Sequence, residues 1–137
     1  MLSPTPLNPA SDTAIGQLLS KFAQGDASML SHIADDIDFR IDHFKDDLDT
    51  RWQTAGSLNE LLGVLERLGK EVFPKGTLAL GIDTFSIGGD WHLTRFNQRF
   101  FYGVRHCEVT SLTHIISHET DGKVDYFRET VTDVTNI

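Results

Sequence analysis

The chain has 137 residues, 39% of them hydrophobic and 23% charged, which suits one buried core and excludes a disordered protein. Its formal net charge of -8 disfavours nucleic acids and anionic membranes as partners, because both bind basic surfaces. Cys107 is the single cysteine, so an internal disulfide is excluded, and no apolar run approaches the ~20 residues of a membrane span. We therefore expect a cytoplasmic protein that binds neither nucleic acid nor membrane.

Residues 1–10 contain three of the four prolines and are expected to form a flexible N-terminal tail. The remainder, residues 11–137, has the length of one ordinary domain. We find no internal repeat and no low-complexity segment, so the sequence predicts a single domain after a short tail.

Two amphipathic helices are predicted near the start of the chain. Ser11 and Asp12 can cap the first helix, and Gly25 ends it. Its apolar face consists of residues at helical spacing, namely Ile15, Leu18, Leu19 and Phe22. Asp26 can cap a second, short helix that carries Met29, Leu30 and Ile33 towards the core.

A third helix is predicted in the middle of the chain. Ser57 and Glu60 form a capping-box pattern, leucines follow on one face, and Pro74 ends the helix. Residues 45–56 are polar, contain Trp52 and are predicted to form the loop that precedes it.

The remaining segments have the two-residue period of β-strands. Around Phe39, apolar and polar residues alternate from residue 37 to residue 42, as in a strand with one wet face. Four more strands, separated by glycine-containing turns, are predicted over residues 77–87, 91–102, 104–118 and 123–134. The order ααβαββββ favours an α+β fold, a cone in which three helices cover a curved antiparallel or mixed sheet. A cavity between the two layers is the default binding site.

Two segments carry a resemblance to a known superfamily. The stretch FAQGDASMLSHIADDID, residues 22–38, resembles the Gly-Asp and Ala-Asp-Asp segment of ketosteroid isomerases and SnoaL-like polyketide cyclases. The stretch DGKVDYFRETVTD, residues 121–133, looks like the closing hairpin of the same nuclear transport factor two-like proteins. This resemblance implies a cone-shaped α+β fold with a pocket and, frequently, a homodimer formed through the sheet. It implies no single reaction, because a common fold hosts many functions.

The catalytic positions of these relatives fall largely on apolar residues of this chain. The resemblance places the proton-shuttling Asp of ketosteroid isomerases on Ile41 and their oxyanion-stabilising Tyr on Leu18, which disfavours steroid-type isomerisation. The resemblance to limonene epoxide hydrolases places their water-holding Tyr and Asn on Phe39 and Ile41, which are apolar. Their catalytic acid on the last strand matches Glu129. One of three aligned roles is therefore retained.

Glu129 is the leading candidate for acid–base catalysis. It shares a strand face with Phe127, so that apolar surroundings would raise the pKa of its carboxyl, although pairing with a cation is the structural alternative. His43 continues the apolar face of its strand and matches a polar aromatic position of scytalone dehydratases. His106 lies near the position of a catalytic histidine in those enzymes. We therefore predict Glu129 and His43 as an acid–base pair, with His106 assisting.

The other predicted site residues would surround a ligand. The loop residue Trp52 is predicted to close over a flat ligand or to act as a plug, and Asn97 to bond a substrate oxygen or to lie in a dimer interface. The complete predicted wall consists of Leu18, Phe22, Phe39, Ile41, Trp52, Asn97 and Phe127. His106, His114 and His118 share one predicted strand face, but the eight residues from His106 to His114 alone span about 26 Å, which excludes a common metal ion.

Two functional hypotheses remain open. The first is an isomerase, cyclase or dehydratase that acts by proton transfer on a hydrophobic cyclic or polyketide-like substrate, without metal or organic cofactor. The alternative is a non-catalytic ligand-binding or assembly domain, a role that this fold takes in small subunits of ring-hydroxylating dioxygenases.

Overall fold

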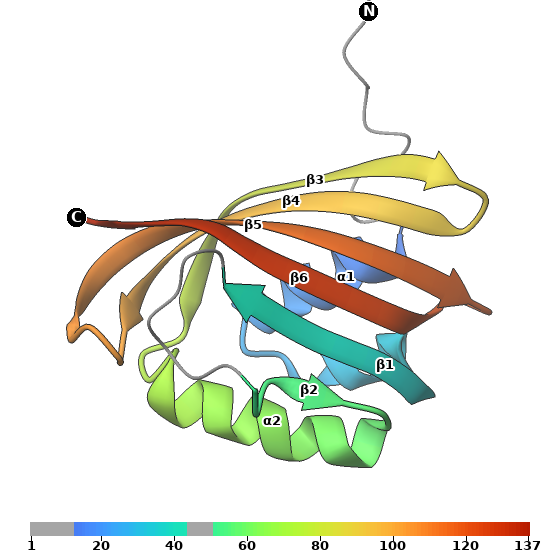
Figure 1. Ribbon diagram of the computed structural model, residues 1–137, viewed down its shortest axis with the longest axis horizontal. Coiled ribbons are helices and arrows are strands. Elements are labelled where there is room, and N and C mark those ends of the chain that lie inside the picture. Colours follow the sequence, from blue (N-terminus) through green and yellow to red (C-terminus); the bar gives the residue numbers. More distant parts are fainter. Residues whose placement is uncertain (1–12, 44–50) are drawn as a thin grey trace, which may run out of the picture.

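The computed structural model describes residues 13–43 and 51–137 (Figure 1). The tail predicted over residues 1–10 and the predicted caps Ser11 and Asp12 lie outside these ranges. The elements follow one another in the order α1 (Ala14–Ala23), the 3-10 helix η2 (Ala27–His32), β1 (Ile33–His43), β2 (Thr54–Ala55), α2 (Leu58–Glu71), β3 (Thr77–Gly88), β4 (Trp91–Tyr102), β5 (Cys107–Thr120) and β6 (Lys123–Asn136).

The six strands form one curved sheet in the order β2-β1-β6-β5-β4-β3. β1 and β6 run parallel, and every other neighbouring pair is antiparallel, so the sheet is mixed. Figure 1 shows α1 and α2 on the same side of the sheet, which bends around them. The predicted α+β cone is confirmed by this arrangement.

Local polar groups fix where the two α-helices begin. Thr13 caps α1, because its hydroxyl oxygen accepts a hydrogen bond of 3.0 Å from the Gly16 N–H. Ser57 caps α2 by accepting a bond of 3.1 Å from the Glu60 N–H, as the capping-box pattern predicts. The Glu60 carboxylate in turn accepts from the Gly56 N–H at 2.8 Å.

The strands agree with the predicted ranges except at some of their ends and at β2, which forms within the segment 45–56 that is predicted as a loop. β1 begins at Ile33, four residues before the predicted start, with a register shift towards β6 between Ile33 and Asp38. β5 begins at Cys107 and not at residue 104, because Tyr102 to His106 form a tight turn. In that turn His106 has a φ of 53° and its N–H donates to the Tyr102 carbonyl oxygen at 2.8 Å.

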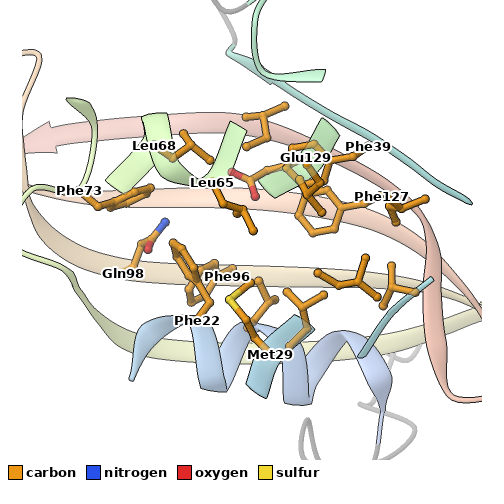
Figure 2. Close-up of a pocket in the computed structure, with 17 residues that line it drawn as sticks. Phe22, Met29, Phe39, Leu65, Leu68, Phe73, Phe96, Gln98, Phe127 and Glu129 are labelled. Carbon is orange, nitrogen blue, oxygen red and sulfur yellow. The ribbon is translucent and has the colours of Figure 1, made fainter. Parts of the chain in front are cut away.

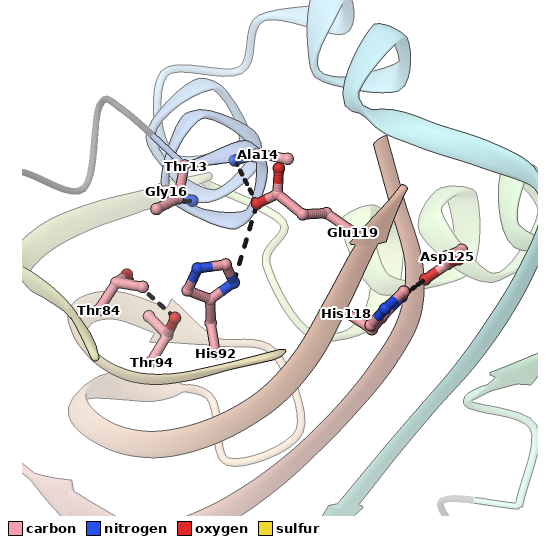
Figure 3. A network of polar contacts seen from close by, with 9 residues as sticks. All are labelled: Thr13, Ala14, Gly16, Thr84, His92, Thr94, His118, Glu119 and Asp125. Carbon is pink, nitrogen blue, oxygen red and sulfur yellow. Dashed lines mark hydrogen bonds and ion pairs between the residues drawn. The ribbon is translucent and has the colours of Figure 1, made fainter. Parts of the chain in front are cut away.

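The first turn of α1 is fastened to the end of β5 (Figure 3). The Glu119 carboxylate accepts a hydrogen bond of 3.3 Å from the Ala14 N–H and lies 3.8 Å from Nδ1 of the buried His92. Beside this contact, the hydroxyls of Thr84 and Thr94 are bonded to each other at 3.1 Å. The start of α1 is therefore held against the sheet.

Candidate functional site

An apolar cavity of about 60 Å³ lies between the helices and the concave face of the sheet (Figure 2). Its wall combines residues of α1, η2, α2 and the three strands β1, β4 and β6, since the two-residue period of each strand turns one set of side chains inwards. The wall consists of Leu18, Leu19, Phe22, Met29, Ile33, Ile37, Phe39, Ile41, Leu61, Leu65, Leu68, Phe73, Phe96, Gln98, Val124, Phe127 and Glu129.

Five of the seven residues predicted to surround a ligand lie in this wall. They come from three elements, α1, β1 and β6, and comprise Leu18, Phe22, Phe39, Ile41 and Phe127. The rings of Phe39 and Phe127 are stacked with their centroids 4.7 Å apart, because the two residues are register partners in the parallel pair β1–β6. Free volume remains beside these side chains, so they do not fill the space between the layers completely.

Glu129 brings a carboxyl group into this apolar wall. Figure 2 shows its carboxylate pointing into the cavity. Among residues 13–43 and 51–137, no hydrogen bond or ion pair reaches this carboxylate, and the neighbouring Arg128 is paired instead with Asp38 at 3.0 Å. The alternative that Glu129 is neutralised by a cation is therefore not observed in the described part of the chain.

Burial raises the pKa of Glu129 from 4.5 to about 7. Glu129 is half-buried, and the surface that its side chain retains lines the cavity. A carboxyl group with this pKa is divided between its acid and base forms near neutral pH. It can therefore give or accept a proton there.

A second cavity of about 40 Å³ adjoins the first, and we call it the polar cavity. The two cavities share five wall residues, among them Glu129 and Gln98, which lie on β6 and β4. The wall of the polar cavity consists of Ile41, His43, Gln53, Leu68, Val72, Phe73, Gln98, Phe100, Tyr102, Ser111, Thr113, Glu129, Val131 and Val134. Glu129 therefore lies at the boundary between an apolar and a polar space.

Gln98 presents its amide nitrogen to the cavities (Figure 2). The Thr77 hydroxyl donates a hydrogen bond of 2.8 Å to the Gln98 Oε1 atom, so this oxygen is occupied and Nε2 is left to face the interior. Gln98 is 3% exposed, and its N–H groups are donors available to a bound molecule.

His43 and His106 have different positions relative to Glu129. His43 lines the polar cavity together with Glu129, as expected from its place on the inward face of β1. His106 is exposed in the turn before β5 and lines neither cavity. The structure therefore brings His43 to the cavity that contains Glu129 but leaves the predicted assisting residue His106 outside.

Trp52 and Asn97 also lie outside both cavities. Trp52 is half-buried, and the Arg67 guanidinium lies 4.1 Å from its ring centroid. Asn97 is exposed on the outer face of β4. In each case the next residue, Gln53 or Gln98, is the one that lines a cavity.

The sequence predictions do not name several polar residues of the cavity walls, among them Gln53, Gln98 and Ser111. A signal existed for Gln98, because it occupies the same alternate position as Phe96 and Phe100. Gln53 falls in a segment that the sequence predicts as a loop, and Ser111 is one of many hydroxyl residues on β5. Neither of these two carries a pattern that marks it.

A surface groove of about 270 Å³ lies outside the apolar cavity. Four side chains line both spaces and separate them, and we call them the gate: Phe22, Met29, Leu65 and Phe73. The rings of Phe22 and Phe73 meet edge to face with centroids 5.4 Å apart. A ligand entering from the groove would have to displace these side chains.

Within the described ranges, no group of three or more His, Cys, Asp or Glu side chains is placed to hold a metal ion. His118 is bonded to Asp125 at 2.7 Å, and His114 to the Thr132 hydroxyl at 3.1 Å. No helix in that part of the chain combines the length and apolar character needed to cross a membrane.

Searches against protein-family models and curated proteins give no match. Solved structures do match over most of the chain. A cystatin-like protein of unknown function from Xanthomonas campestris has a TM-score of 0.70, 15% identity and 92% coverage of both chains. A candidate polyketide cyclase from Xanthomonas campestris pv. campestris has a TM-score of 0.67, 13% identity and 88% coverage of both chains.

A third similar structure is a protein co-crystallised with a small molecule. It is TerC co-crystallised with polyporic acid, with a TM-score of 0.65, 17% identity, and coverage of 89% of this chain and 90% of TerC. At these identities the three likenesses establish a shared fold and leave the reaction to be argued from the site.

Proposed function

We propose that this chain, which has the nuclear transport factor two-like α+β fold of SnoaL-like proteins, is a cofactor-independent acid–base enzyme. Its substrate is a hydrophobic cyclic compound, and its reaction is an isomerisation, a cyclisation or a dehydration. The observation that carries the proposal is Glu129, a carboxyl group without a protein partner in the described chain that projects into an apolar cavity.

Glu129 is the general base and acid of the proposed mechanism. Its carboxylate removes a proton from a carbon next to a substrate carbonyl. The electron pair of that C–H bond forms a carbon–carbon double bond, and the π pair of the carbonyl moves to its oxygen, which gives an enolate. The Gln98 Nε2 hydrogens donate to this developing negative charge. If the proton returns to another carbon, the reaction is an isomerisation. If the enolate attacks a second carbonyl of the same molecule, it is a cyclisation. If a β-hydroxyl group leaves as water, it is a dehydration.

The position of Glu129 in the sheet supports this role. The resemblance to ketosteroid isomerases assigns the position of their proton-shuttling Asp to Ile41, which carries no acid. Glu129 is the register partner of Ile41 on the neighbouring strand, about 4.8 Å away across the sheet. A carboxyl group is thus present on the same wall of the cavity, displaced by one strand.

His43 is the proposed second titratable group of the site. It lines the polar cavity with Glu129 and would exchange protons with the oxygen end of a substrate. We assign no catalytic role to His106, because it is exposed in a turn outside both cavities.

The size of the cavities favours a small substrate. The apolar cavity of about 60 Å³ is far below the ~300 Å³ at which pockets for drug-sized ligands begin. A single hydrophobic ring therefore fits the proposal better than an extended polyketide chain. A larger substrate would require the gate to open towards the surface groove.

The proposed function can be tested by proton exchange without knowledge of the natural substrate. Cyclohexanone and 1-tetralone would be incubated with the protein in D2O, and loss of their α-proton signals followed by NMR. We expect the wild-type protein to accelerate the exchange and Glu129→Gln to lose roughly 100-fold or more of that acceleration. Asp133→Asn removes an exposed carboxylate from the same strand and serves as the matched control.

Equal exchange rates for the wild-type protein and Glu129→Gln would refute the proposal. Binding of the ketones without any exchange would instead identify a non-catalytic ligand-binding domain.

We also propose that two copies associate through the convex face of the sheet. Trp91 and Ile116 are 40% and 42% exposed there, and the Trp91 ring packs against His118 and Tyr126. Light scattering would show a dimer for the wild-type protein and a monomer for Ile116→Arg. A wild-type monomer would contradict this proposal.

A further inference from the structure

Two residues in the wall of the polar cavity each carry a buried polar atom that has no hydrogen-bond partner in the described chain. The atoms are Oε1 of Gln53 and Oγ of Ser111, and these residues are only 4% and 3% exposed. Buried polar groups in proteins are nearly always bonded, because an unmet group loses its bonds to water and gains none in exchange. Two residues with unsatisfied hydrogen-bonding groups in the wall of one small cavity therefore indicate a binding site for a polar group of a ligand.

The backbone brings Gln53 and Ser111 to the polar cavity from different parts of the sheet. The Ile41 N–H donates to the Gln53 carbonyl oxygen at 3.0 Å, which holds Gln53 beside β1. Ser111 lies on β5 directly opposite Gln98 of β4. Gln53, Ser111 and Gln98 thus approach the polar cavity from separate strands or strand ends, with Glu129 at its boundary.

The available groups define the guest chemically. Gln53 Oε1 accepts a hydrogen bond, the Gln98 amide nitrogen donates one, and the Ser111 hydroxyl can do either. A hydroxyl group also donates and accepts, so it can satisfy Gln53 and Gln98 at once. A carbonyl oxygen only accepts and would leave the Gln53 oxygen unmet.

We infer that the polar cavity is a subsite for the hydroxyl group of a compact ring compound whose apolar ring occupies the adjoining apolar cavity. The subsite is formed by Gln53, Gln98 and Ser111. This inference rests on the proposed function for the catalytic role of Glu129. With the hydroxyl group in the subsite, Glu129 would face the ring carbons nearest that hydroxyl. An enol or a phenol has this pattern, with an oxygen at one end of an otherwise apolar ring.

A matched pair of probes tests the subsite by binding alone. Phenol and toluene have similar rings and differ in a hydroxyl against a methyl group. Their dissociation constants would be measured by ligand-observed NMR, with a competition control to confirm one shared site. We expect the wild-type protein to bind phenol roughly tenfold more tightly than toluene, the factor of about one net hydrogen bond.

Variants of the subsite assign that preference to its residues. Gln53→Met removes a side-chain amide and Ser111→Ala removes a hydroxyl group, and each should reduce the preference for phenol while leaving toluene binding within about twofold. Thr110→Ala is the matched control, because Thr110 precedes Ser111 but lies outside both cavity walls. Since either variant could affect folding, circular dichroism accompanies both. Gln53 lies beside β1 and Ser111 on β5, so the two variants are independent tests.

The outcomes separate the subsite from the proposed function. Equal affinity of the wild-type protein for phenol and toluene would mean that the polar cavity holds only water, and it would overturn the inference. A preference that survives in both variants would overturn it as well. A preference lost in both variants supports the subsite even where the Glu129-dependent proton exchange fails, whereas that failure counts against the proposed function alone.

Discussion

Glu129 and Ile41 lie opposite each other in the parallel pair β1–β6, and both line the apolar and the polar cavity. The two cavities meet beside this pair. One member is an apolar residue where the ketosteroid isomerases are expected to carry an acid, and the other is an acid. The behaviour of this carboxyl group, of the gate and of the packing around the cavity can be tested by substitution.

The stability of the protein should depend on the ionisation of Glu129. The pKa of Glu129 is about 7 in the folded protein, against an ordinary value of 4.5 that applies to the unfolded chain. Between these two pH values the folded state therefore binds more protons than the unfolded state. Stability from this group is therefore lost as the pH rises from about 4.5 to about 7 and stays low above. Glu129→Gln, which stays neutral, should be more stable than the wild type at pH 8 by up to about 3 kcal/mol.

Urea denaturation at pH 5 and pH 8 measures this difference. The gain in the variant should be small at pH 5, where folded Glu129 is already neutral. Asp133→Asn should show no such dependence, since its carboxyl is exposed. A gain of the same size at both pH values would point to packing and not to ionisation.

The rate of α-proton exchange should follow the base form of Glu129. Only the carboxylate can remove a proton, so kcat/KM is expected to rise about tenfold per pH unit below pH 7 and to level off above it. NMR exchange rates between pH 5 and pH 9 give the profile. A profile that is flat through pH 7 would exclude Glu129 as the base.

Truncation of the gate should ease entry of larger ligands. Phe22→Ala removes the ring that meets Phe73 and opens the wall between the groove and the apolar cavity. We expect tighter binding of naphthalene, read from its fluorescence, and a stability loss of about 2 kcal/mol, below the ~3–5 of a fully buried phenylalanine. Phe101→Ala, also half-buried but outside both cavities, should lose stability without gaining naphthalene binding.

Two glycine substitutions should have opposite effects on stability. A Cβ atom on Gly103 would collide with the Glu71 carbonyl oxygen and approach Pro74 Cδ to 3.2 Å, where the Gly103 N–H donates to the Val72 carbonyl at 3.1 Å. Gly103→Ala should cost about 1–3 kcal/mol. Gly63→Ala, with no atom within 4 Å of its Cβ in exposed α2, should gain about 0.5–1 kcal/mol. Thermal unfolding compares them, and a stable Gly103→Ala would show that α2 does not depend on this contact.

The two layers and much of the apolar wall could be predicted, because the periodicity and order of the elements indicate them and the resemblance to a known superfamily supports them. Alternation placed Phe39, Ile41 and Phe127 on inward faces, and Glu129 followed from sharing the face of Phe127. The parallel pairing of β1 with β6 has no comparable signal, since it depends on which distant strands meet.

The polar residues were harder to predict because adjacent strand residues face opposite ways. Asn97 and Gln98 are consecutive amides, and only the alternation with the flanking phenylalanines distinguishes the inward one. The loop residue Gln53 reaches the cavity through a backbone bond to Ile41 that no local pattern encodes. His106 was displaced from its predicted strand by the turn that follows Tyr102.

The two ends of α1 are attached to different parts of the molecule. Glu119 holds the first turn of the helix to β5, whereas the last turn carries Phe22 and is joined through Lys21 to His32 of η2 at 2.9 Å. The gate residues Phe22 and Met29 therefore belong to the helical layer, and Glu129 belongs to the sheet. In the proposed mechanism, substrate entry and proton transfer thus depend on side chains of separate layers.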